Sequence, residues 1–240
     1  MKKTEEAGMS DKYFLEFESR AALDEKMAED VTAVLQQAIE RRGKASLVVS
    51  GGSTPKGFFQ AMADKTIDWS KLTITLADDR WVPPSHEDSN DRLVQENMLQ
   101  GPASAANFVP LVTEDAHPRE AVAAVSESLA DLGTVDVMIL GMGGDGHFAS
   151  LFPDSETLKP GLDLRSGNTL IAVDPPVAPH ARMSMTLPRI FDTRHLLVHL
   201  VGDDKRAIWD KARAEQDPEN LPIAAVIASQ SPLAEVYWAP

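Results

Sequence analysis

The chain has 240 residues, of which 43% are hydrophobic and 25% charged, the composition of an ordinary globular protein with one large α/β domain or at most two small ones. It contains no cysteine, which excludes a disulfide framework, a thiolate metal site and a cysteine nucleophile. Its formal net charge of −14 disfavours nucleic acid and anionic membranes as partners, because their phosphate groups bind basic surfaces.

The N-terminal residues include lysines but no apolar stretch behind them, so they do not form a secretory signal. No run approaches the roughly 18 apolar residues of a membrane helix. We therefore expect a protein of the cytoplasm, with residues 1–12 as a flexible N-terminus.

Helical and strand-like stretches alternate along the chain. Residues 20–41 predict an amphipathic helix, because apolar residues recur at steps of three and four: Leu23, Met27, Val31, Val34, Leu35, Ala38 and Ile39. Strands are predicted at 45–50, 72–77, 135–140, 168–173, 194–201 and 233–238, and further helices from about 56, near 88–99, near 117–131 and near 203–214. This alternation favours an α/β fold with a mostly parallel sheet flanked by helices.

Three predicted strands end in polar or glycine-rich loops, where ligands of open α/β sheets bind. The first loop consists of Ser50, Gly51, Gly52, Ser53, Thr54 and Pro55. Its glycines let a ligand approach the backbone closely. Pro55 suits the first position of a helix, and the hydroxyls of Ser53 and Thr54 can cap that helix. The N–H groups of a helix start bind anions. The loop is therefore either a phosphate site or an ordinary βα turn.

The second loop consists of Asp78, Asp79, Arg80, Trp81, Val82 and Pro83. Two carboxylates and a guanidinium directly after a buried strand are costly in free energy unless they are paired or have a function. They are either functional groups at a strand end or a surface ion pair.

The third loop runs from Gly141 to Pro153 and contains the pattern Gly-x-Gly-x-x-Gly. A dinucleotide site is disfavoured, because Pro153 arrives too soon for the long helix and Asp145 would repel a pyrophosphate. The loop instead presents Asp145 and His147 together. Histidine, with an unperturbed pKa of about 6.5, suits a general base near neutral pH. Asp145 either orients the ring or acts on its own.

Two cations elsewhere in the chain, Arg182 and Lys205, are candidates to complete an anion site, although each taken singly also fits a solvated surface residue. The residues alone thus predict an α/β enzyme that acts on a phosphorylated small molecule, with no metal evident.

The three loops resemble the signatures of the 6-phosphogluconolactonase family, with Asp88-Ser89-Asn90 behind the second loop and the segments around Arg182 and Lys205 in matching order. The resemblance extends from about residue 15 to the end, so it implies a single domain over residues 1–240. It implies a fold similar to that of glucosamine-6-phosphate deaminase and ribose-5-phosphate isomerase. It also implies hydrolysis of 6-phospho-D-glucono-1,5-lactone to 6-phosphogluconate in the oxidative pentose phosphate pathway, without cofactor or metal.

By the same resemblance, His147 is the general base and Asp145 its partner or substitute. The residues that would bind the substrate and its phosphate are Gly51, Gly52, Ser53, Thr54, Gly144, Arg182 and Lys205. Arg80 and Asp78 would line the reacting end of the sugar, and either Arg80 or loop N–H groups would stabilise the oxyanion. The expected partner is a small phosphorylated sugar lactone, bound by a monomer or small homo-oligomer.

Two other functions are alternatives. A glucosamine-6-phosphate deaminase has a glutamate five residues after the histidine, where this chain has Phe152, which cannot transfer protons. A non-catalytic sugar-phosphate-sensing domain would follow a helix-turn-helix, but the residues before the first loop are taken up by a strand and a long helix.

Overall fold

The computed structural model describes residues 13–240, so the expected flexible N-terminus at 1–12 lies outside the described residues. Its main sheet has seven strands that all run parallel, in the order β1-β10-β9-β6-β2-β3-β5. These strands are β1 (Phe14–Glu16), β2 (Ala45–Val49), β3 (Leu72–Leu76), β5 (Asn107–Phe108), β6 (Val135–Leu140), β9 (Thr193–Val201) and β10 (Ala234–Ala239). The predicted parallel α/β fold is confirmed.

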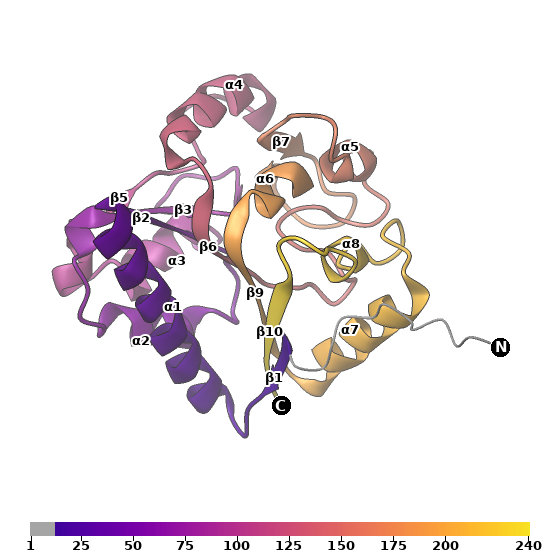
Figure 1. Cartoon of the computed structure of the whole chain (residues 1–240). Helices are drawn as coiled ribbons and strands as arrows, with labels where there is room; N and C mark the ends of the chain where they lie inside the picture. Colours follow the sequence, from indigo (N-terminus) through magenta and orange to yellow (C-terminus); the bar gives the residue numbers. More distant parts are fainter. Residues whose placement is uncertain (1–12) are drawn as a thin grey trace.

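Helices lie on both sides of this sheet, with α1 on one side and α7 and α8 on the other (Figure 1). The α-helices are α1 (Arg20–Arg42), α2 (Lys56–Ala63), α3 (Asn90–Asn97), α4 (Pro118–Ser128), α5 (Leu158–Leu162), α6 (Leu187–Phe191), α7 (Asp203–Glu215) and α8 (Ala224–Ile227). Between residues 13 and 240, no helix combines the length and the apolar character needed to cross a bilayer.

Helix α1 begins and ends where its sequence dictates. The Ser19 hydroxyl accepts a hydrogen bond from the N–H of Ala22 at 3.3 Å, and Gly43 ends the helix in the left-handed conformation with φ 75°. The predicted apolar stripe faces the sheet, and its buried members are Leu23, Met27, Val31, Leu35 and Ala38. Burial of this stripe fixes the helix against the sheet.

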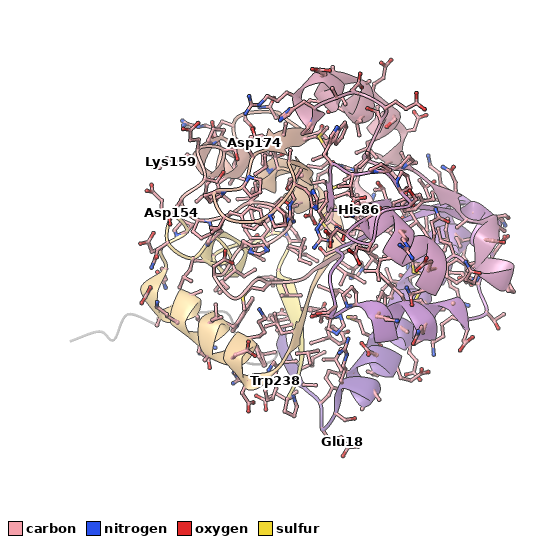
Figure 2. The ribbon with its side chains drawn as sticks, turned by 180° about the vertical axis from the view of Figure 1, so that it is seen from behind. Glu18, His86, Asp154, Lys159, Asp174 and Trp238 are labelled. Carbon is pink, nitrogen blue, oxygen red and sulfur yellow. The ribbon has the colours of Figure 1, made fainter. Side chains whose placement is uncertain are left out.

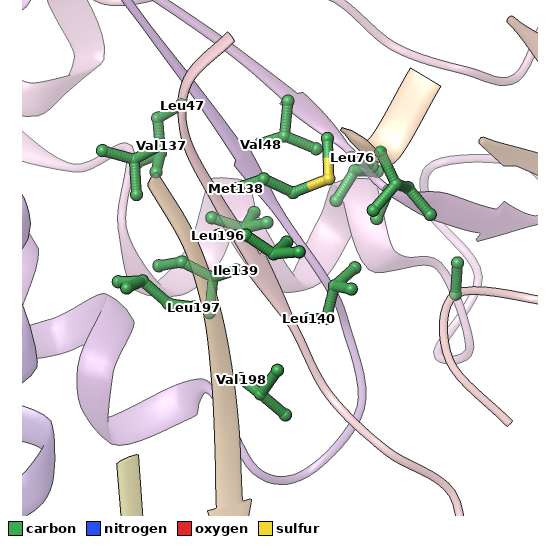
Figure 3. Close-up of a cluster of buried hydrophobic side chains, with 14 of the residues drawn as sticks. Leu47, Val48, Leu76, Val137, Met138, Ile139, Leu140, Leu196, Leu197 and Val198 are labelled. Carbon is green, nitrogen blue, oxygen red and sulfur yellow. The ribbon is translucent and has the colours of Figure 1, made fainter. Parts of the chain in front are cut away.

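The central strands are apolar on both faces because helices cover both. Every residue of β2 and of β6 is buried. Figure 3 shows side chains of β2, β6 and β9 packed together, among them Leu47, Met138 and Leu197. This packing fixes the positions of the carboxyl ends of the strands relative to one another. The polar loops begin at these ends.

A second, three-stranded antiparallel sheet lies beside the first and consists of β4 (Asp78–Arg80), β8 (Arg182–Met185) and β7 (Leu170–Val173). The sequence predicts residues 78–80 as loop, and this is wrong: they are extended because they pair with β8, which places Arg80 opposite Arg182. The strand predicted at 168–173 exists as β7, in this second sheet. The pairing brings two segments about a hundred residues apart to one side of the cleft described next.

Candidate active site

The carboxyl ends of β9, β6, β2 and β3 are adjacent in the sheet, and a cleft of about 220 Å³ opens there. It is lined by Ser50, Gly51, Gly52, Ser53, Thr54, Asp78, Arg80, Asn90, Gly141, Met142, Gly143, His147, Ala149, Arg182 and Lys205. All three predicted loops and both predicted cations thus contribute to one site.

The loop after β2 offers a row of backbone donors to this cleft. Within the described part of the chain, the N–H groups of residues 51–54 have no hydrogen-bond partner. Gly51 has to be glycine, since a Cβ there would lie 1.8 Å from Oδ1 of Asn90, and Gly52 has φ +90°. Successive unpaired N–H groups beside a helix start form an anion-binding concavity.

Arg20 fixes the orientation of this loop from behind. One of its guanidinium nitrogens donates to the carbonyls of Ser53 and Thr54, both at 2.7 Å. Because the peptide group is planar and trans, turning the Ser53 carbonyl toward Arg20 points the N–H of Thr54 the other way. The predicted capping of α2 by the Ser53 and Thr54 hydroxyls is wrong: Pro55 occupies the cap position, and no side chain caps the helix.

The two aspartates after β3 are both buried, which excludes the surface ion pair as an explanation. Asp79 accepts hydrogen bonds from the N–H groups of Arg80 at 2.7 Å, Asn90 at 2.8 Å and Asp91 at 3.1 Å. Burial nevertheless raises the pKa of Asp79 to about 7. Asp79 does not line the cleft; it ties β4 to the first turn of α3.

Asp78 and Arg80, by contrast, face the cleft and are held by neighbours. Asp78 accepts a hydrogen bond from the Ser150 hydroxyl at 2.5 Å. The guanidinium of Arg80 donates through Nη1 to the carbonyl of Asp88 at 2.8 Å and to Oδ1 of Asn90 at 2.7 Å. Asn90 in turn donates to the carbonyl of Asp78 at 2.9 Å, so this side of the cleft is rigid.

The loop after β6 builds a histidine–carboxylate pair from two residues nearly adjacent in sequence. Nδ1 of His147 lies 2.5 Å from Oδ1 of Asp145, which also accepts from the N–H of His147 at 3.2 Å. A Cβ on Gly143 would lie 2.1 Å from that ring nitrogen, so only glycine fits. His147 lines the cleft, whereas Asp145 does not.

The protonation of this pair follows from its contacts. Partial burial acts to raise the pKa of Asp145, but hydrogen bonds and charge attraction from His147 outweigh it and hold that pKa below its ordinary value. Asp145 is therefore ionised near neutral pH and accepts a hydrogen bond from the N–H at Nδ1 of His147. The other ring nitrogen, Nε2, is left with its lone pair.

Two cations remain available to a ligand. Arg182 is buried, and its Cζ lies 5.3 Å from the centroid of the Phe152 ring. Its Nη1 lies 4.0 Å from Oδ2 of Asp78, and its Nε has no hydrogen-bond partner among the described residues. Burial lowers the pKa of Arg182, while Asp78 opposes the shift. Lys205, in the first turn of α7, makes no hydrogen bond or ion pair to any described residue. Both line the cleft.

The cleft contains most of the predicted site residues: Gly51, Gly52, Ser53, Thr54, Asp78, Arg80, His147, Arg182 and Lys205. Asp145 and Gly144 lie just behind it, Gly144 next to Lys205. Sequence reasoning assigned no role to Asn90, which stands within the Asp88-Ser89-Asn90 segment. It also missed Arg20 and Ser150, which carry no local signal because they act on distant segments.

Comparison with known proteins identifies the family. A family model described as glucosamine-6-phosphate isomerases/6-phosphogluconolactonase matches residues 18–238. The chain belongs to this family. It is 42% identical over 226 residues to a 6-phosphogluconolactonase of Rhizobium meliloti, covering 93% of this chain and 97% of the relative. It is 38% identical over 229 residues to a 6-phosphogluconolactonase of Neisseria meningitidis serogroup B, again covering 93% and 97%.

Solved structures of family members agree with the fold. The crystal structure of a 6-phosphogluconolactonase from Shewanella baltica superposes with a TM-score of 0.92 at 39% identity, covering 95% of this chain and 97% of that one. A monomeric glucosamine-6-phosphate deaminase superposes with a TM-score of 0.77 at 14% identity, which shows the shared fold alone. Both activities named in the family occur on this fold, so side chains in the cleft have to distinguish them.

Proposed function

We propose that this member of the family is a 6-phosphogluconolactonase, a carboxylic ester hydrolase that converts 6-phospho-D-glucono-1,5-lactone and water to 6-phosphogluconate. The observation that carries the proposal is the His147–Asp145 pair, which opens onto the same cleft as the N–H-lined loop at residues 51–54. The relatives named as lactonases cover nearly the whole chain and support the same reaction. The oxidative pentose phosphate pathway and the cytoplasm are parts of this proposal.

His147 acts as the general base. Its Nε2 takes a proton from a water molecule as that water attacks the lactone carbonyl, and the resulting imidazolium is stabilised by the ionised Asp145. When the tetrahedral intermediate collapses, the bond between the carbonyl carbon and the ring oxygen breaks, and the imidazolium returns the proton to that oxygen, which becomes a hydroxyl of the product. Asp145 does not line the cleft, and it contacts Nδ1 and the backbone N–H of His147, which supports an orienting role. A lactone is a reactive ester, so a positioned water and a base suffice, and no covalent intermediate is needed.

The phosphate of the substrate binds against the loop at residues 51–54, with Arg182 and Lys205 as counter-charges. The unpaired N–H groups supply directed donors, and the two cations have no competing strong ion pair. Charge-assisted hydrogen bonds of this kind are the strong ones. They also give an acidic chain a local attraction for an anionic substrate.

Arg80 stabilises the negative oxygen of the tetrahedral intermediate. Its two recorded hydrogen bonds both use Nη1, which leaves its other N–H groups free among the described residues. The contacts to Asp88 and Asn90 hold the guanidinium in place before the substrate arrives, as electrostatic stabilisation of a transition state requires.

Deamination of glucosamine 6-phosphate fits this cleft less well. The Phe152 ring packs against His147, with 4.3 Å between ring centroids. It stands five residues after the histidine, where the resemblance implies that a deaminase has a glutamate.

The deciding experiment is an assay on freshly prepared 6-phosphogluconolactone, corrected for spontaneous hydrolysis. We expect rapid, enzyme-dependent hydrolysis and no ammonia release from glucosamine 6-phosphate. Comparable rates with the two substrates, or ammonia release alone, would reject the lactonase assignment.

A further inference from the structure

We propose that His86, Asp88 and His180 form a binding site for a divalent transition-metal ion such as Zn²⁺, on the rim of the cleft. The site takes no part in the hydrolysis proposed above and does not depend on it. It is inferred from three side chains that two separate segments bring together.

The distances between these side chains suit a metal. Nε2 of His180 lies 3.0 Å from Oδ2 of Asp88, and Nδ1 of His86 lies 3.8 Å from the same oxygen. One ligand atom from each of the three residues lies within 4.8 Å of the other two. In a tetrahedral zinc site with bonds of about 2.0–2.1 Å, ligand atoms are about 3.4 Å apart. Small side-chain movements are therefore enough to close the three around an ion.

The two segments are already fixed relative to each other. His86 and Asp88 lie between β4 and α3, and His180 comes shortly before β8. At the base of these segments, the N–H of Trp81 donates to the carbonyl of Ala181 at 2.7 Å. The two imidazole rings meet edge to face, with centroids 5.2 Å apart. Much of the geometry is thus set before an ion binds, which limits the entropy lost on binding.

The surroundings allow an ion to enter from solvent. The exposed fractions of the side chains are 39% for His86, 46% for Asp88 and 28% for His180. Figure 2, which shows the molecule from behind, places His86 among the side chains near the middle of that face. The site is accessible, yet each ligand is partly shielded from water.

The ligand set selects the class of ion. Two imidazole nitrogens and one carboxylate oxygen suit Zn²⁺, Co²⁺, Ni²⁺ or Cu²⁺, whereas Mg²⁺ and Ca²⁺ prefer oxygen ligands. Three protein ligands leave the fourth position to water. Binding exchanges one local contact, because Nδ1 of His86 accepts a hydrogen bond from the N–H of Asp88 at 3.1 Å. Binding also replaces the hydrogen bond between His180 and Asp88 with two metal bonds to the same atoms.

The test is calorimetric titration of ZnCl₂ into the untagged, EDTA-treated and dialysed full-length chain, in a buffer that does not bind metal. We expect one ion per chain, and a rise in Tm with Zn²⁺ because the ion binds only the folded site. His180→Ala and His86→Ala should each weaken binding by more than about 100-fold, since losing even an outer-shell partner costs 10–100-fold.

The matched control is His117→Ala. His117 also pairs with an aspartate, Asp174, at 3.1 Å and with similar exposure, but among residues 13–240 no third metal-ligating side chain joins them. This variant should bind Zn²⁺ like the unaltered chain. No Zn²⁺ binding to the unaltered chain would overturn the proposal. Equal affinity of the unaltered chain and a folded His180→Ala variant would also overturn it and would place the ion elsewhere, for example at Asp145 and His147.

Discussion

The two halves of the active-site cleft are built in different ways. The base of the reactive half is local: Asp145 and His147 are two residues apart and hold each other through contacts within one loop. The anion-binding half is assembled from distant parts of the chain: Arg20, residues 51–54, Arg182 and Lys205. The difference separates chemistry from binding, so substitutions in the two halves should alter different kinetic constants.

The largest effect is expected in the reactive half. His147→Ala should lower kcat by about 10²–10⁴, because it removes the general base, and should leave KM nearly unchanged. Asp145→Asn should lower kcat less if the carboxylate only orients the ring. Both variants are compared by steady-state kinetics after circular dichroism shows that they fold. A nearly active His147→Ala beside an inactive Asp145→Asn would transfer the role of base to Asp145.

The next effect concerns the two cations of the anion-binding half. Arg182→Ala and Lys205→Ala should each raise KM by roughly tenfold to a hundredfold, the loss expected for a charge-assisted contact of about 1.5–3 kcal/mol. Lys211→Ala, on the exposed part of the same helix as Lys205, is the control and should leave KM unchanged. Unphosphorylated gluconolactone should be a poor substrate for every variant. Efficient hydrolysis of that compound by the unaltered enzyme would argue against a phosphate site.

A smaller effect is expected behind the anion loop. Arg20→Ala removes two hydrogen bonds to the carbonyls of Ser53 and Thr54 and frees the loop to rotate its N–H groups. KM for the phosphorylated lactone and the inhibition constant of inorganic phosphate should both rise roughly two- to tenfold. Arg41→Ala, exposed at the other end of α1, is the matched control. A fall in kcat with unchanged phosphate inhibition would show that Arg20 serves the reactive half instead.

The last effect is on stability and not on a kinetic constant, and it arises from Asp79. Its pKa is raised from 3.8 to about 7 in the folded state, so the folded chain holds a proton that the unfolded chain releases. This contribution to the free energy of unfolding is present below pH 3.8 and is lost as pH rises through about 7. The free energy of unfolding, measured with urea between pH 4 and 8, should therefore fall with rising pH more steeply in the unaltered chain than in Asp79→Asn. If the free energy of unfolding changes with pH equally in the two proteins, Asp79 makes no such contribution.

The same contrast explains what sequence could predict. β6 at Val135–Leu140 is apolar except for Asp136, and its bounds are found as predicted. Asp78–Arg80 consists of three charged residues, so it shows no alternation that would reveal a strand. It is extended because it pairs with β8, which lies far along the chain. The role of Arg20 is hidden for the same reason. Local patterns encode the reactive pair and the buried strands, whereas the supports of the anion site emerge only from the tertiary fold.

The most direct test of this division is the affinity of the His147→Ala variant for 6-phosphogluconate, measured by isothermal titration calorimetry beside the unaltered enzyme and Lys205→Ala. If chemistry and binding are carried by separate halves, His147→Ala should bind 6-phosphogluconate nearly as tightly as the unaltered enzyme, although it has lost most of its turnover. Lys205→Ala should bind it about ten- to a hundredfold more weakly. Loss of binding in His147→Ala, with binding intact in Lys205→Ala, would contradict the account.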